Sequence, residues 1–126
     1  MSTKRVLVID DEADIRTIIQ SCLEGIAQWE VLTARSGEEG LQIAAITQPD
    51  GILLDLSMPG IDGLEVLARL REDTATQAIP VALLTAKTLS DAQSHQVERA
   101  IAGFILKPFD PMTLVEQVAA IFQWQN

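Results

Sequence analysis

The chain has 126 residues and a mass of 13.7 kDa, with 48% hydrophobic and 21% charged residues. These values predict one globular domain, residues 1–126, whose core needs no disulfide or metal to fold, and they exclude a disordered chain. The net charge of −9 disfavours binding to nucleic acid or to an anionic membrane, and it favours basic partners or a bound cation.

Cysteine content and hydropathy exclude several further classes. Cys22 is the single cysteine, so the chain cannot form an internal disulfide, and we expect a cytoplasmic protein. The apolar stretch near the amino terminus is too short for a secretory signal. No apolar run approaches the roughly 18 residues that a membrane span requires, which argues against membrane insertion.

The first apolar run, Arg5–Ile9, is rich in β-branched residues and predicts a strand. A helical stripe follows it at Ile15, Ile18, Ile19, Cys22, Leu23 and Ile26. A weaker run, Glu30–Ala34, predicts the second strand. The second helix should begin at Ser36, which forms a capping-box pattern with Glu39, and should end before Pro49.

The same alternation continues through the second half. Gly51–Leu54, Val81–Leu84 and Gly103–Leu106 are almost continuously apolar, which is typical of parallel strands buried on both faces. Asp62 is expected to cap the third helix, and Pro111 is expected in the first turn of the fifth. Helical stripes support the last three helices at Leu64, Val66, Leu67 and Leu70, at Leu89, Val97 and Ala100, and at Val115, Val118, Ala119 and Phe122.

Five strand–helix units predict an α/β fold, with a doubly wound, five-stranded parallel sheet, (βα)5, that carries helices on both faces. Ligands bind such a sheet beyond the carboxyl ends of its strands. Chemically active residues stand at those ends: Asp10, Asp11 and Glu12 after the first strand, Asp55 after the third, Thr85 after the fourth and Lys107 after the fifth. We interpret Glu12 mainly as a helix cap, with a minor share in the acidic pocket.

Carboxylates that lie close together repel one another unless they take up protons or share a cation. Oxygen ligands alone favour a hard ion, so the sequence predicts a Mg²⁺ site, with Mn²⁺ as the alternative. Asp55 can then act as a nucleophile that forms an acyl phosphate. Lys107 and Thr85 can bind the phosphoryl oxygens and stabilise the transition state.

The sequence resembles the receiver domains of two-component response regulators, which have a flavodoxin-like fold, and the likeness covers essentially the whole chain. Four segments carry it: Val8–Glu12, Leu53–Gly63, Leu83–Ala86 and Leu106–Phe109. The resemblance implies that Asp55 receives a phosphoryl group from a phosphohistidine. It also implies that Asp11, Asp55 and the backbone carbonyl of Ser57 bind Mg²⁺ directly, and that Asp10 acts mainly through a metal-bound water.

Further roles follow from the same resemblance. Lys107 would contact the phosphoryl group, and Thr85 would move toward it after transfer. Phe104 would turn inward to fill the space that Thr85 leaves. Small Ala86 would let its loop approach the phosphate. Lys87 and Ser57 stand where the family tunes the lifetime of the acyl phosphate, and the Lys107–Pro108 bond resembles the family's cis peptide.

The leading hypothesis is a stand-alone receiver without an output domain, and not an enzyme beyond its own phosphorylation and slow self-dephosphorylation. A sensor histidine kinase or a histidine phosphotransfer protein would phosphorylate it. The face formed by the fourth helix, the fifth strand and the fifth helix would contact another protein, as a monomer or a phosphorylation-dependent dimer. Alternatives are an adaptor that is never phosphorylated, a small phosphatase with an Asp nucleophile, and a flavin-binding module. Ser57 stands where that phosphatase needs an acid, and Asp10–Glu12 would repel a flavin phosphate.

Overall fold

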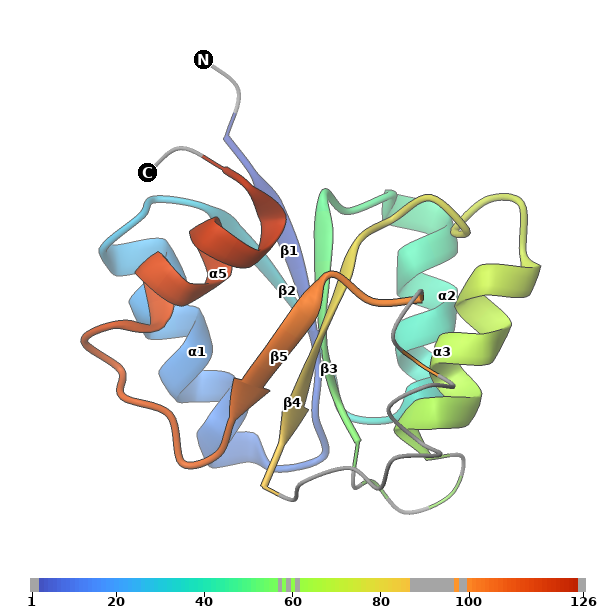
Figure 1. Ribbon diagram of the computed structural model, residues 1–126, viewed down its shortest axis with the longest axis horizontal. Helices are drawn as coiled ribbons and strands as arrows, with labels where there is room; N and C mark the ends of the chain where they lie inside the picture. Colours follow the sequence, from blue (N-terminus) through green and yellow to red (C-terminus); the bar gives the residue numbers. More distant parts are fainter. Residues whose placement is uncertain are drawn as a thin grey trace.

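The computed structural model describes residues 3–56, 58, 60, 62–86, 97 and 100–124. Its elements in chain order are β1 (Arg5–Ile9), α1 (Ala13–Gly25), β2 (Glu30–Ala34), α2 (Gly37–Thr47), β3 (Gly51–Asp55), α3 (Gly63–Glu72), β4 (Val81–Thr85), β5 (Gly103–Leu106) and α5 (Leu114–Phe122). Figure 1 shows α1 and α5 on one face of the sheet and α2 and α3 on the other. None of these helices has the length and apolar content that crossing a membrane requires.

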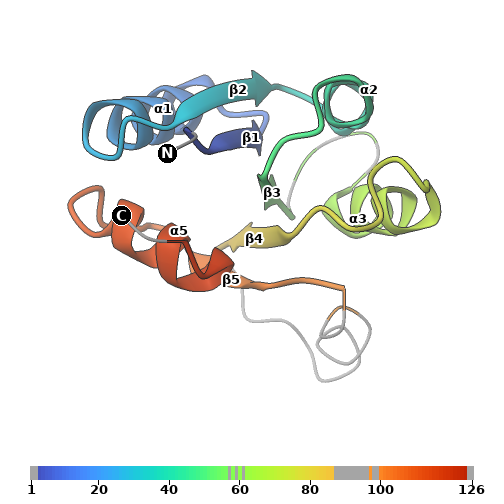
Figure 2. The same ribbon diagram turned by 90° about the horizontal axis from the view of Figure 1, so that it is seen from above.

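The five strands form one parallel sheet in the order β2-β1-β3-β4-β5. The view from above shows the two helical layers on either side of it (Figure 2). The order reverses between β1 and β3, and a doubly wound sheet binds its ligands at such a reversal. The predicted α/β fold and its parallel sheet are therefore confirmed.

Each strand divides its side chains between two separate cores, because successive residues of a strand point to opposite faces. Val6 and Val8 of β1 pack with α1 and α5, whereas Leu7 and Ile9 pack with α2 and α3. All four of these side chains are fully buried. This double burial explains why the strands read as continuous apolar runs, and it leaves the strand ends as the place for polar chemistry.

The two predicted helix caps are present. Ser36 Oγ accepts a hydrogen bond from the Glu39 amide at 3.1 Å, and Asp62 Oδ1 accepts one from the Glu65 amide at 2.9 Å. Each bond satisfies an amide that the first helical turn leaves unpaired.

The expected start of the last helix is wrong. Pro111 lies in a turn, and α5 begins at Leu114. Asp110 accounts for the difference, because its Oδ1 accepts from the Met112 amide at 2.9 Å and its carbonyl accepts from the Thr113 amide at 3.0 Å. These bonds close a turn that delays the helix. Most of the predicted fourth helix lies outside the described residues. Val97, which is described, is buried in the core on the α2–α3 side.

Candidate functional site

Four carboxylates gather where the strand order reverses. Asp10, Asp11 and Glu12 follow β1, and Asp55 is the last residue of β3. Each offers one carboxylate oxygen, and all these oxygens lie within 4.8 Å of one another. Asp10 and Asp55 are buried, with exposed fractions of 0% and 2%, whereas Asp11 and Glu12 are exposed. The sequence therefore placed these acids correctly at one edge of the sheet.

Backbone hydrogen bonds fix the position of Asp10. Its amide donates to the Ala34 carbonyl at 3.0 Å, and its Oδ1 accepts from the Glu12 amide at 2.9 Å. Its carbonyl accepts from Arg16 Nη1 at 2.7 Å. Sequence reasoning missed Arg16, since no motif connects a residue in the first turns of α1 with the carbonyl before that helix.

Lys107 is the cation of the cluster. Its Nζ lies 2.9 Å from Asp10 Oδ2, 3.4 Å from Asp55 Oδ1 and 3.5 Å from Glu12 Oε1. Burial alone lowers the pKa of Lys107, but the hydrogen bond to Asp10 and the charges of Asp10, Asp55 and Glu12 outweigh it, so the pKa is raised. Lys107 is therefore charged at neutral pH and offsets part of the repulsion among the acids.

The interpretation of Glu12 mainly as a helix cap needs correction. Glu12 occupies the N-cap position of α1, but its side chain makes no capping hydrogen bond. Its carboxylate instead lies 3.5 Å from Lys107 Nζ. Glutamate is not among the residues whose side chains are favoured as helix N-caps, which are Ser, Thr, Asp and Asn.

Thr85 ends β4 beside these groups and is 3% exposed. Its carbonyl accepts the Lys107 amide at 2.8 Å, which connects the end of β4 with the residue after β5. Thr85 pairs with Leu106, whereas Phe104 on β5 is 42% exposed. The Lys107–Pro108 peptide is cis, the isomer that the sequence suggests. Ala86 is exposed directly after Thr85, and Ser57 and Lys87 lie outside the described residues.

Gly63, the first residue of α3, packs closely against the backbone at the end of β3. A Cβ at this position would lie 2.6 Å from the Asp55 carbonyl oxygen and 2.6 Å from the Leu56 Cα, and both are backbone atoms. We expect Gly63→Ala to lower the free energy of unfolding by about 2 kcal/mol, because the end of β3 must shift. Urea denaturation measures this change. Gly25→Ala is the control, since nothing lies within 4 Å of its added methyl group. Equal stability of the two variants would contradict this assignment.

Comparison with known proteins finds related sequences over nearly the whole chain. A family model described as the response regulator receiver domain matches residues 6–119. The phosphate regulon transcriptional regulatory protein PhoB of Pseudomonas aeruginosa is 37% identical over 123 residues, which cover 98% of this chain and 53% of that protein. The transcriptional regulatory protein PrrA of Mycobacterium leprae is 35% identical, over 98% of this chain and 52% of that protein. This chain thus spans about half the length of these curated relatives.

Solved structures also resemble the chain. The chemotaxis response regulator CheY4 of Vibrio cholerae aligns with a TM-score of 0.86 and 30% identity, covering 95% of this chain and 99% of that chain. The N-terminal domain of a response regulator receiver protein from Methanoculleus marisnigri aligns with a TM-score of 0.80 and 36% identity, covering 98% and 100% of the two chains.

Proposed function

The chain belongs to the family of response regulator receiver domains, and from that premise we propose that Asp55 accepts a phosphoryl group from a phosphohistidine of a sensor kinase or phosphotransfer protein. The observation that carries this proposal is the position of Asp55, buried at the end of β3 among three further acids and 3.4 Å from Lys107 Nζ. A carboxylate in this setting can act as a nucleophile whose reaction the surrounding charges support.

In the proposed reaction, an Asp55 carboxylate oxygen attacks phosphorus, and the bond from phosphorus to the donor's imidazole nitrogen breaks. The imidazole leaves with that electron pair and takes a proton from solvent. Negative charge spreads over the phosphoryl oxygens during transfer, and in this proposal the Lys107 ammonium and the Thr85 hydroxyl stabilise it. Hydrolysis of the acyl phosphate by water would return Asp55, so the domain resets slowly without acting on other substrates.

The acidic cluster fits a bound Mg²⁺, since its oxygen ligands are those this ion prefers. We propose that Asp11 and Asp55 bind it directly, with the Ser57 carbonyl, and that Asp10 binds through a water; Mn²⁺ could replace it. The ion would neutralise charge on the transferring group. Lys107 Nζ lies nearer to Asp10 Oδ2, at 2.9 Å, than to Asp55 Oδ1, at 3.4 Å, and this difference supports the indirect role of Asp10.

Mg²⁺ is expected to stabilise the folded chain, because it relieves repulsion that the unfolded chain does not have. At about ten times its dissociation constant, the ion should add about 1.4 kcal/mol to the free energy of unfolding. Thermal denaturation with and without Mg²⁺ measures this gain. Asp11→Asn should lose most of it, whereas Asp14→Asn, an exposed acid outside the cluster, should retain it. The same gain in both variants would remove Asp11 from the site.

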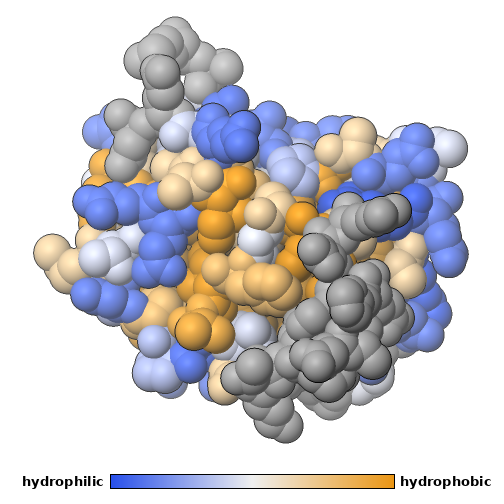
Figure 3. Space-filling model, viewed as in Figure 1, coloured by the Kyte–Doolittle hydropathy of each residue, from blue (hydrophilic) through white to orange (hydrophobic). Residues whose placement is uncertain are grey.

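We further propose that β5 and α5 form the output surface together with the predicted fourth helix. Figure 3 shows apolar residues gathered over the face that β5 occupies. Phe104 and Leu106 of β5 are 42% and 66% exposed, and Met112, between β5 and α5, is 79% exposed. A second protein could bind this surface, or a second copy of the chain after phosphorylation. Action in the cytoplasm is part of the same proposal.

Identification of the modified residue tests the proposed acceptor. The chain is incubated with acetyl phosphate and Mg²⁺, and the acyl phosphate is reduced with borohydride and mapped by peptide mass spectrometry. Modification of Asp55 alone is the expected result. Modification of Asp10, Asp11 or Glu12 would assign the nucleophile to another acid.

A further inference from the structure

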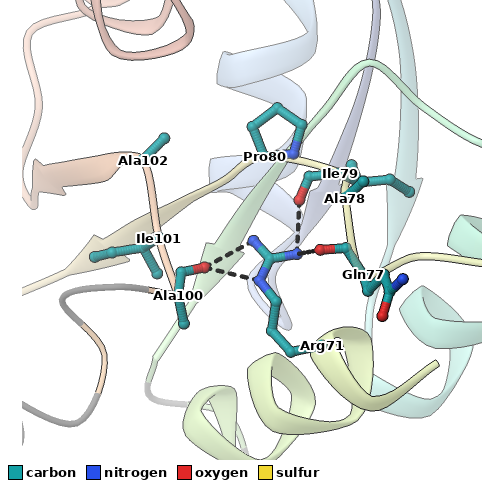
Figure 4. A pocket seen from close by; sticks show the side chains of 8 residues that line it. All are labelled: Arg71, Gln77, Ala78, Ile79, Pro80, Ala100, Ile101 and Ala102. Carbon is teal, nitrogen blue, oxygen red and sulfur yellow. Dashed lines mark hydrogen bonds between the residues drawn. The ribbon is translucent and has the colours of Figure 1, made fainter. Parts of the chain in front are cut away.

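Arg71 lies near the carboxyl end of α3. Its guanidinium group lies against a pocket of about 320 Å³ between α3 and the segments that lead into β4 and β5 (Figure 4). Nε and Nη2 donate to the Ala100 carbonyl at 2.9 and 2.7 Å. Nη1 donates to the carbonyls of Gln77 and Ile79 at 3.0 and 2.8 Å. One side chain thus joins three separate parts of the chain.

The partners of Arg71 are unusual for a cation. Within the described part of the chain, no carboxylate lies within ion-pair distance of it, and backbone carbonyls alone receive its hydrogen bonds. A guanidinium group suits this task because its donors have a fixed planar fork, which the single ammonium group of lysine cannot reproduce. The arrangement therefore depends on geometry and not on charge alone.

These bonds lie at the opposite end of the sheet from Asp55. Thr85 ends β4 at the acidic edge, and the parallel strand β5 must begin at the other edge, at Gly103. Residues 100–102 lead into β5 and lie beside Arg71. They are held further by bonds from the Ala100 amide to the Val97 carbonyl at 2.8 Å and from the Ala102 amide to the Val81 carbonyl at 2.7 Å. Val97 is also buried, with 1% exposed.

We propose that Arg71 is a positioning residue for the signalling response: it fixes the start of β5 against the start of β4, so that a change at Thr85 is transmitted to Phe104. The inference rests on the proposed function. If the start of β5 could slide past β4, β5 could follow a movement of Thr85 as a whole. Because Arg71 holds both Ile79 and Ala100, the movement must be taken up along β5, whose end is joined to Thr85 through the Lys107 amide.

The test separates phosphorylation from its consequence. Chains labelled with 4-fluorophenylalanine report on Phe104 by ¹⁹F NMR, with the resonance assigned through Phe104→Leu, and intact mass gives the phosphorylated fraction. Arg71→Met keeps the apolar stem and removes all four bonds, and Arg71→Lys keeps the charge without the fork. Arg69→Met is the control, because Arg69 lies on the same helix and its ion pair within the described residues is an exposed contact with Glu65 at 3.7 Å.

The expected result is that Arg71→Met is phosphorylated within about twofold of the wild-type extent, while the shift of the Phe104 resonance per phosphorylated molecule falls below about half. The Ala102 amide should exchange about tenfold faster. Arg71→Lys should fall between Arg71→Met and wild type, and Arg69→Met should match wild type. A full Phe104 shift in Arg71→Met despite faster Ala102 exchange would overturn the inference, as would a phosphorylated wild type without any Phe104 shift. No phosphorylation of the wild type would instead overturn the proposed function.

Discussion

Asp55→Asn is expected to abolish phosphoryl transfer to the chain. The amide keeps the size of the side chain but has no negatively charged oxygen to attack phosphorus, so the yield of acyl phosphate should fall by more than about 100-fold. Intact mass spectrometry with acetyl phosphate and Mg²⁺ measures it. The fold should survive, because the change removes one charge from a crowded acidic cluster.

Asp14→Asn is the matched control for this variant, because Asp14 is an exposed acid on α1 outside the cluster. It should be phosphorylated like the wild type. Two outcomes would contradict the assignment: an adduct that persists in Asp55→Asn, or an adduct that disappears in both variants. The first would show that another side chain is the nucleophile.

Lys107→Met is expected to change two measurements in opposite directions. Transfer from acetyl phosphate at saturating Mg²⁺ should slow by about 100-fold, because the ammonium group no longer stabilises charge on the phosphoryl oxygens. Affinity for Mg²⁺ should rise several-fold, because a competing cation has left the neighbourhood of Asp10 and Asp55. Rates from intact mass and a calorimetric titration give the two values.

Lys4→Met is the control for this second prediction, since Lys4 precedes β1 at the opposite end of the sheet and lies 5.4 Å from the centre of the Trp124 ring. It should change neither value. Loss of transfer together with loss of Mg²⁺ affinity in Lys107→Met would indicate a collapsed pocket, and it would remove the proposed role of Lys107 in transfer.

The raised pKa of Lys107 also gives the sign of a pH effect. A group whose pKa is higher in the folded chain contributes its full stability below its unfolded value and loses it as the pH rises through the folded value. The stability difference between wild type and Lys107→Met should therefore be constant near neutral pH and disappear only under strongly alkaline conditions.

Much of this architecture could be predicted from the sequence, because its cause is local and repeated. Continuous apolar runs such as Val6–Ile9 are fully buried on both faces, and this burial selects a parallel sheet covered by helices. Once the sheet is parallel, the strand ends meet at one edge. The strand order β1-β3-β4-β5 then brings Asp10, Asp55, Thr85 and Lys107 together at that edge.

Other parts of the site depend on bonds between segments that leave no pattern in the sequence. The hydrogen bond from Arg16 to the Asp10 carbonyl and the fork of Arg71 both have backbone partners, which every residue offers equally. Glu12 shows the same limit. Its position at the start of a helix suggested a cap, and only the fold brings Lys107 within 3.5 Å of it.

We claim that the acidic pocket takes one phosphoryl group on Asp55 with the help of a divalent cation. The most direct measurement is the intact mass of the wild-type chain after incubation with acetyl phosphate, with Mg²⁺ and with a chelator in its place. A single phosphoryl adduct that forms with Mg²⁺ and not with the chelator is the predicted result. An adduct that forms equally in both, or no adduct with Mg²⁺ present, would contradict the claim.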